Sequence, residues 1–391
     1  MKKISGYSIS RVWTWLSALI VIVLATACGG NNSTSGSIGV SLTDAPACGF
    51  DAVYVTVSKV RFHQSISASD TDAGWTDIML NPARKINLLN LTNGVLDNLG
   101  ATPLAAGHYT QLRLVLDDTA MANSVVLPGS TTEIPLVTPS ATKSGIKLVN
   151  QFDVAPSQHV DLVLDFNACK SIVKRGNKTF ALKPVIKVLP YTLNGIGGFV
   201  DTTLLNSSVM VSAEQNGVIV QSTMPASNGA FLLSRLALGS YDVVITADGR
   251  ATAVIASVPV TSSSNTINVN NSITPIILPT SNTHSVNGTV SLPMGSTEVA
   301  YVAAKQNLGP SLTVTTNTVA ADDLTGNYIM ALPVEAPLLG IYSALQPITF
   351  APQTSAAGIY GVEAFASGYI GQSSNVDIST ADVTQNFTLA P

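Results

Sequence analysis

The chain has 391 residues, of which 46% are hydrophobic and only 11% are charged, and its formal net charge is −4. This balance excludes an intrinsically disordered chain, which combines high charge with low hydrophobicity. The 19 Lys and Arg residues form no block. Nucleic acid is therefore excluded as a partner, because its binding requires a basic stripe. The length predicts two or three domains.

The chain opens with a basic start and an apolar run. Lys2, Lys3 and Arg11 accompany an apolar stretch over residues 12–27, which is shorter than the ~20 residues of a transmembrane helix. Small residues then lead directly to a single cysteine. We therefore predict a cleaved signal peptide over residues 1–27 rather than a membrane span.

The residues around Cys28, LATACGG, resemble the lipobox of bacterial lipoproteins, although Ala25 stands where that motif usually has Leu. The resemblance implies that Cys28 becomes the lipidated N-terminus and that a lipid bilayer is a partner of the mature chain. Gly29 is not the aspartate that holds some lipoproteins in the inner membrane. The resemblance therefore implies export to the bacterial outer membrane or cell surface.

Two further cysteines remain in this predicted exported chain, Cys48 and Cys169. One remaining pair in an exported chain predicts a disulfide, which would contribute about 2–4 kcal/mol. A two-thiol metal site is disfavoured because neither cysteine has a CxxC or a nearby His partner. We predict no metal site, and no motif implies a cofactor.

A tether rich in Gly, Ser and Asn over residues 28–37 leads to a first predicted domain over residues 38–191. Apolar residues alternate with polar or small ones in several short segments, which predicts half-buried strands. A phase slip at Lys59 predicts a β-bulge, and Pro184 predicts an edge position or an irregularity in the last segment. The pattern favours an antiparallel β-sandwich or barrel.

Four stretches of this domain, in order, resemble the bacterial domain of unknown function DUF4382. They are GVSLTDAP at 39–46, VYVTVSKV at 53–60, GHYTQLRLVLDD at 107–118 and ALKPVIKV at 181–188. The resemblance covers roughly residues 37–191. It implies a domain of envelope lipoproteins and brings no established activity.

Beyond this domain the sequence repeats itself. A Gly-x-Tyr-x-Val pattern begins at Gly239 and recurs at Gly358. In the first copy, Asn216-Gly217 predicts a tight hairpin, because both residues tolerate positive φ. The second copy carries extra residues around 333–352, which we predict to be a loop insertion.

The two repeats resemble carboxypeptidase regulatory-like modules, which have a transthyretin-like, Ig-like fold. We place them at residues 192–279 and, in a more divergent copy, at residues 280–391. The resemblance implies spacer or binding modules and carries no catalytic residues. The predicted fold class is therefore all-β, with a DUF4382-like sandwich followed by two Ig-like or transthyretin-like sandwiches in tandem.

The sequence shows no common signature of a hydrolase or metalloenzyme: no HExxH, no GxSxG elbow and no GxxxxGK loop. Acidic pairs in loops are candidate calcium ligands, but we interpret them as solvated turn residues; they are Asp70/Asp72, Asp117/Asp118 and Asp322/Asp323. Trp75 is either a stacking platform for a sugar or a packed loop anchor, and we favour the anchor.

These observations predict a non-enzymatic, membrane-anchored envelope lipoprotein that binds a glycan, matrix or protein partner through its β domains. Two alternatives remain open: a purely structural spacer of an envelope assembly, and an enzyme with an unrecognised site in the first domain. The enzyme is disfavoured because titratable residues are sparse, whereas catalysis needs perturbed groups clustered in a pocket.

Overall fold

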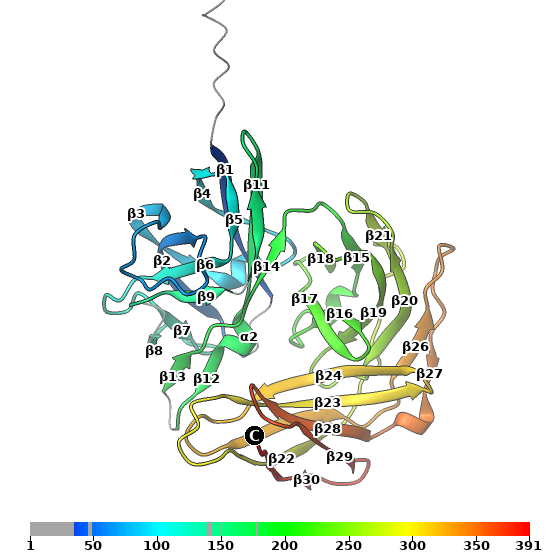
Figure 1. The fold of residues 1–391 in the computed structure, drawn as a ribbon. Coiled ribbons are helices and arrows are strands. Elements are labelled where there is room, and N and C mark those ends of the chain that lie inside the picture. The colour runs from blue at the N-terminus through cyan, green and yellow to red at the C-terminus, as the bar shows by residue number, and fades with distance from the viewer. Residues whose placement is uncertain (1–34, 46–48, 139–142, 149, 177–178) are drawn as a thin grey trace, which may run out of the picture.

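The computed structural model describes residues 35–45, 49–138, 143–148, 150–176 and 179–391. Over these residues the chain is almost entirely β, and its buried apolar side chains form three main cores. Sheets on opposite sides of each core make β-sandwiches, as predicted. Figure 1 shows an N-terminal module on the left, a middle module on the right and a C-terminal module beneath both.

The described residues of the N-terminal module form fourteen strands and two short helices. They are β1 (Ser35–Ala45), β2 (Ala52–His63), β3 (Thr76–Asn87), the 3-10 helix η1 (Leu88–Leu91), β4 (Asp97–Ala105), β5 (Gly107–Tyr109), β6 (Gln111–Leu116), β7 (Ser124–Val126), β8 (Glu133–Val137), β9 (Ile146–Leu148), β10 (Phe152–Val154), β11 (His159–Asn167), α2 (Ala168–Ser171), β12 (Ile172–Lys174), β13 (Phe180–Leu182) and β14 (Ile186–Pro190). A four-stranded sheet, ordered β14-β11-β1-β4, packs against an eight-stranded sheet. β1 is central in the first sheet, because it pairs in parallel with β11 and antiparallel with β4.

Two local predictions for this module are confirmed. The ladders from β2 to β3 and to β6 shift register between Val57 and Lys59, which is the predicted bulge. Pro184 separates β13 from β14, and these two strands lie in different sheets. The last predicted strand is therefore two strands, joined where proline has no N–H to donate to a ladder.

The middle module contains β15 (Gly195–Phe199), the 3-10 helix η2 (Thr202–Leu204), β16 (Met210–Gln215), β17 (Val218–Thr223), β18 (Ala230–Ser234), β19 (Gly239–Thr246), β20 (Ala253–Val260) and β21 (Thr266–Asn268). The C-terminal module contains β22 (Thr283–Ser291), β23 (Ala300–Gly309), β24 (Leu312–Ala320), β25 (Asn327–Pro333), β26 (Leu338–Ile341), β27 (Ala351–Pro352), the 3-10 helix η3 (Thr354–Ala356), β28 (Ile359–Ala366), β29 (Gln372–Asp377), β30 (Val383–Thr384) and β31 (Phe387–Thr388).

These two modules follow one plan. The strand order β17-β16-β19-β20 in the middle module corresponds to β24-β23-β28-β29 in the C-terminal module, and β18-β15-β21 corresponds to β25-β22-β30. Tyr241 and Tyr360, which belong to the repeated pattern, are both buried. Asn216 and Gly217 join β16 to β17 with positive φ at both positions, which confirms the predicted hairpin.

The extra residues of the second copy differ from the predicted loop, because they contain β26 and β27. β26 leaves its own module and pairs in parallel with β20, so a six-stranded sheet spans the middle and C-terminal modules. The prediction of a loop is wrong because the partner strand lies in another module, and such long-range pairing leaves no trace in local periodicity.

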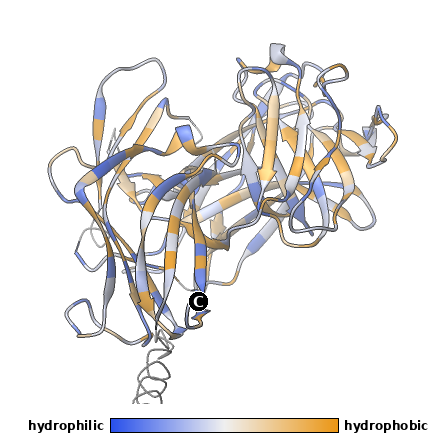
Figure 2. Cartoon of the chain, turned by 90° about the horizontal axis from the view of Figure 1, so that it is seen from above, coloured by the Kyte–Doolittle hydropathy of each residue, from blue (hydrophilic) through white to orange (hydrophobic). Residues whose placement is uncertain are grey.

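The alternation that predicted the strands is visible in three dimensions. Figure 2 shows short hydrophobic and hydrophilic bands alternating along many of the strands. Because successive side chains of a strand point to opposite faces, the hydrophobic bands supply the cores and the hydrophilic bands face outward.

Candidate functional site

Of the three cysteines, Cys169 alone lies within the described residues. It belongs to α2, where Asn167 Oδ1 accepts a hydrogen bond from Lys170 N at 2.9 Å and caps the first turn. Cys28 and Cys48 lie outside the described residues. Lipidation of Cys28 and a disulfide between Cys48 and Cys169 therefore stay predictions.

Two of the three acidic pairs lie in exposed turns, as predicted. Ser69 donates to Asp72 from its backbone N at 2.9 Å and from its hydroxyl at 2.6 Å. The side-chain hydrogen bond from Ser69 is the main reason why the pKa of Asp72 is lowered. Asp117 accepts in the same way from Thr119, and Asp118 is exposed.

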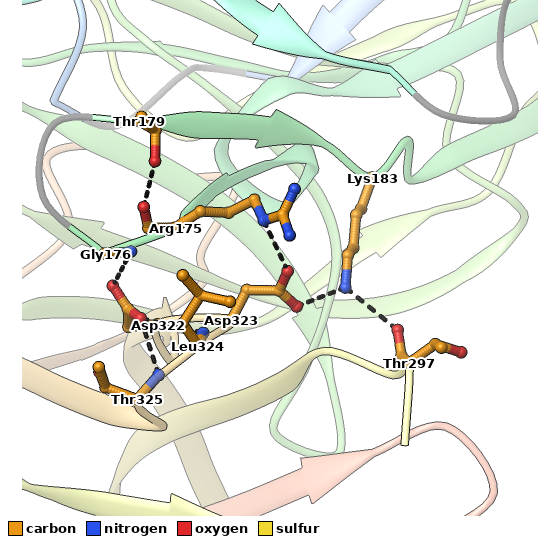
Figure 3. A network of polar contacts seen from close by, with 9 residues as sticks. All are labelled: Arg175, Gly176, Thr179, Lys183, Thr297, Asp322, Asp323, Leu324 and Thr325. Carbon is orange, nitrogen blue, oxygen red and sulfur yellow. Dashed lines mark hydrogen bonds and ion pairs between the residues drawn. The ribbon is translucent and has the colours of Figure 1, made fainter. Parts of the chain in front are cut away.

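The third acidic pair is not a solvated turn, which corrects the prediction. Figure 3 shows Asp322 and Asp323 of the C-terminal module facing residues of the N-terminal module. Asp323 Oδ1 lies 2.6 Å from Lys183 Nζ, and its Oδ2 lies 3.3 Å from Arg175 Nε. Asp322 Oδ2 accepts from Gly176 N at 3.0 Å. The turn is therefore a polar contact between the two modules.

Trp75 is packed in its loop. Its indole N–H donates to Ser69 O at 2.8 Å, and the guanidinium groups of Arg61 and Arg113 lie 4.6 Å and 4.8 Å from the ring centroid. The His63 ring lies 5.0 Å away. These contacts favour the loop anchor over a sugar platform, because cations occupy the π-system that a sugar would stack on.

One constellation of catalytic residue types forms at the start of β1 and β11. Ser37 Oγ lies 2.8 Å from His159 Nδ1, and His159 Nε2 lies 3.0 Å from Asp161 Oδ1. Both the His159 and Asp161 side chains are half exposed, and Ser37 N already donates to Gln158 O. The group thus lies open to solvent, and the backbone N–H of Ser37 is not available to an oxyanion, whereas acyl-transfer chemistry depends on enclosed, free donors.

A half-open cavity of about 280 Å³ lies beside the Asp322–Asp323 turn. Its lining comes from the C-terminal module and mixes polar residues, including Ser296, Glu298 and Thr325, with apolar ones. Across the described residues, no three His, Cys, Asp or Glu side chains come together in a way that could hold a metal ion. The same residues include no helix that is long and apolar enough to cross a membrane.

Glu214 is a buried carboxylate at the contact between the middle and C-terminal modules. Its Oε2 accepts from Thr315 N at 2.8 Å, and its Oε1 accepts from Ser212 Oγ at 3.1 Å. The β23–β24 ladder shifts register between Ala304 and Lys305, next to Thr315, and such a bulge releases a backbone donor from the ladder. Burial raises the pKa of Glu214 to about 7.

Charged groups also lie between the N-terminal and middle modules. Asp165 is 4% exposed, and burial raises its pKa while Lys187 opposes that shift. Burial lowers the pKa of Lys187, whose Nζ donates to Val220 O at 2.6 Å. Asn93 and Thr223 exchange hydrogen bonds across the same contact. These polar groups are engaged in holding modules together.

Solved structures similar to this chain superpose only loosely. A mutant type II cohesin–X-dockerin complex from Acetivibrio cellulolyticus aligns at 26% identity over 22% of this chain and 56% of that chain, with a TM-score of 0.18. The alignment thus spans little more than half of that chain. A streptococcal ancillary pilin aligns at 10% identity over 90% of this chain and 99% of that chain, with a TM-score of 0.16. The Corynebacterium diphtheriae major pilin SpaA aligns at 8% identity over 90% of this chain and 99% of that chain, with a TM-score of 0.20.

Superpositions this loose carry no argument about function. No curated protein matches the chain, and the resemblance of the two repeats to carboxypeptidase regulatory-like modules stays a prediction. The N-terminal module is different, because residues 35–184 match the family DUF4382, a domain of unknown function. The chain therefore carries a DUF4382 domain, as its strand motifs predict.

Proposed function

We propose that this protein is a membrane-anchored envelope lipoprotein, held by lipid on Cys28, that binds a glycan, matrix or protein partner without catalysing a reaction. The observation that carries the proposal is the use of polar groups across the described residues. Asp323, Glu214 and Asp165 are engaged in three separate contacts between modules rather than gathered in one site. Such an arrangement suits a rigid display platform better than an enzyme.

The anchor is tested by membrane fractionation and intact mass of the wild type beside Cys28→Ala. We expect a diacylglycerol adduct and membrane retention only in the wild type. Ser33→Ala, a change in the same tether, is the control and should behave like the wild type. An unmodified wild-type chain that is secreted free would overturn the anchor.

Mass mapping without reduction tests the pairing of Cys48 with Cys169. We expect one cross-linked peptide pair in the exported protein, which reduction separates. Two free thiols in the exported protein would contradict the disulfide.

The binding surface is proposed on the loops of the N-terminal module. Ile66 is 62% exposed in the loop between β2 and β3, whereas Ile273 is 88% exposed in the middle module. We expect wild-type protein to bind an immobilised envelope polysaccharide or matrix protein, Ile66→Ser to bind less, and Ile273→Ser to bind normally. An anchored protein that binds no member of such a panel would instead support the spacer alternative.

The Ser37–His159–Asp161 contact is the one observation that favours an enzyme. Hydrolysis of p-nitrophenyl acetate and labelling by a fluorophosphonate test it. We expect the wild type and Ser37→Ala to be indistinguishable, because the group lies open to water. Turnover that Ser37→Ala abolishes while Ser41→Ala preserves it would establish a hydrolase.

A further inference from the structure

β26, a strand of the C-terminal module, pairs with β20 of the middle module. Four residues, Leu338–Ile341, pair in parallel with Ala253–Ala256 of β20. Backbone hydrogen bonds extend this contact at both ends: Leu338 N donates to Thr252 O at 2.8 Å, and Tyr342 N donates to Ala256 O at 2.9 Å. We call residues 337–352, which include β26 and β27, the strap. Figure 1 shows the strap along the outer side of β20.

Two successive side chains of β26 enter different apolar environments, whereas Ile341 is 62% exposed. Leu338 packs against the core of the middle module. Leu339 packs against a separate cluster between the middle and C-terminal modules, formed by Val244, Val254, Leu308, Val314 and Ala356. The first two residues of the strand therefore pack on opposite faces of the sheet.

The rest of the strap closes over the same core. Tyr342, Ile348 and Phe350 pack against the middle core, and Gln346 Nε2 donates to Asn268 O at 3.0 Å. Gly340 leaves room for Ile348 to pack against β26, because a Cβ at Gly340 would lie 2.7 Å from Ile348 Cγ2. By contrast, Leu345 at the tip is 85% exposed.

The repeat offers an internal comparison. β29 corresponds to β20 by strand order, yet within the described residues it pairs only with β28. β29 reads QSSNVD and is largely exposed, whereas the paired part of β20 is buried and reads AVIA. A polar edge strand is stable in contact with solvent, whereas an apolar edge strand has to be covered by another segment. The link between β18 and β19 in the middle module is only residues 235–238, too short to supply one.

We propose that the β20 edge is a binding groove for an extended apolar peptide strand running parallel to β20, filled in this chain by the strap. Backbone hydrogen bonds supply affinity, and the two apolar sites that hold Leu338 and Leu339 select large apolar side chains, as in other cases of strand addition. This inference goes beyond the proposed function and does not rest on the anchor or on the surface loops.

The first test empties the groove. Residues 334–357 are replaced by Arg-Leu-Ala-Leu, the link that the middle module uses at residues 235–238. A fluorescein-labelled peptide of residues 335–353 should then bind saturably by fluorescence polarisation, and it should not bind the intact protein. A Leu338→Asp peptide should bind about tenfold more weakly or worse, because its charge would enter the core. A Leu345→Asp peptide is the matched control and should bind normally.

A folded variant that fails to bind the peptide, or equal binding to the intact protein, would overturn the proposal. A second measurement does not require the variant to fold. Protease recognition sequences are inserted after Glu335 and after Leu345, both exposed, and the strand is excised from the folded full chain. We expect the cut segment to co-elute with the protein on gel filtration, whereas its release would count against the groove.

Discussion

At the scale of single residues, Glu214 links packing to pH. Its folded-state pKa of about 7 lies above the ordinary value of 4.5, so the folded protein holds an extra proton between those values. Stability should therefore fall as pH rises from about 4.5 to about 7, by about 3 kcal/mol in all, and stay level above that range. Glu214→Gln should reduce this slope without abolishing it, because burial also raises the pKa of Asp165, and the variant should be more stable than the wild type at pH 8.

Urea unfolding at pH 4.5 and pH 8 measures this effect. Glu298→Gln, a change at an exposed carboxylate, is the control and should keep the wild-type difference between the two pH values. An undiminished fall in stability in the Glu214→Gln protein would show that Glu214 contributes nothing to it.

Asp323 gives a second prediction at this scale. Asp323→Asn removes ion pairs to Lys183 and Arg175, whose side chains are 30% and 35% exposed. Because solvent screens such partners, we expect a loss of only about 1 kcal/mol, smaller at high salt. Thermal melts at low and high salt test it beside the exposed Asp118→Asn. An equal loss in both variants would rule out a special role for the turn.

Sequence patterns recover some of these residues but not others. Trp75 is the packed anchor that its polar loop suggested, and Asp72 and Asp117 lie in turns as expected, where they also accept local hydrogen bonds. Glu214 is missed because alternation in β16 places it on the outward face with Ser212, opposite Val211 and Ala213. That face is buried by β24 of another module, and no local pattern reports contacts between modules.

At the scale of elements, the strands and their irregularities are largely predictable. The bulge near Lys59 and the break at Pro184 follow from local chemistry, namely a phase slip and a missing N–H. The repeat predicts that two modules share a plan, and the strand orders agree. β26 escapes prediction because its four paired residues, LLGI, are too short for periodicity, and their partner lies far away in the chain.

The strap yields a prediction for Gly340. Gly340→Val would bring side-chain atoms against Ile348 and Phe350, and overpacking of this kind costs about 1–3 kcal/mol. We expect a lower melting temperature and faster amide exchange along β20. Gly309→Val is the control, because a Cβ at Gly309 meets nothing within 4 Å. Unchanged exchange along β20 in Gly340→Val would contradict this packing.

At the scale of the whole molecule, the three modules contact one another in every pairing. Asp323 joins the outer two, Lys187 joins the first two, and the strap joins the last two. We therefore expect one calorimetric unfolding transition for the wild type. Replacing the strap and adding Asp323→Asn should split it into at least two. Separate transitions in the wild type would show that these contacts are too weak to couple the cores.

The position of β1 has a mechanical consequence. β1 is the first described strand, and it lies between β4 and β11, with parallel pairs from Ser37↔His159 to Ala45↔Asn167. A pull on the N-terminal end of the chain would act along this strand. It would load the two ladders in shear, so that many hydrogen bonds must yield together rather than one after another. A molecule held at that end would therefore resist a pulling force without unfolding first at its N-terminal strand.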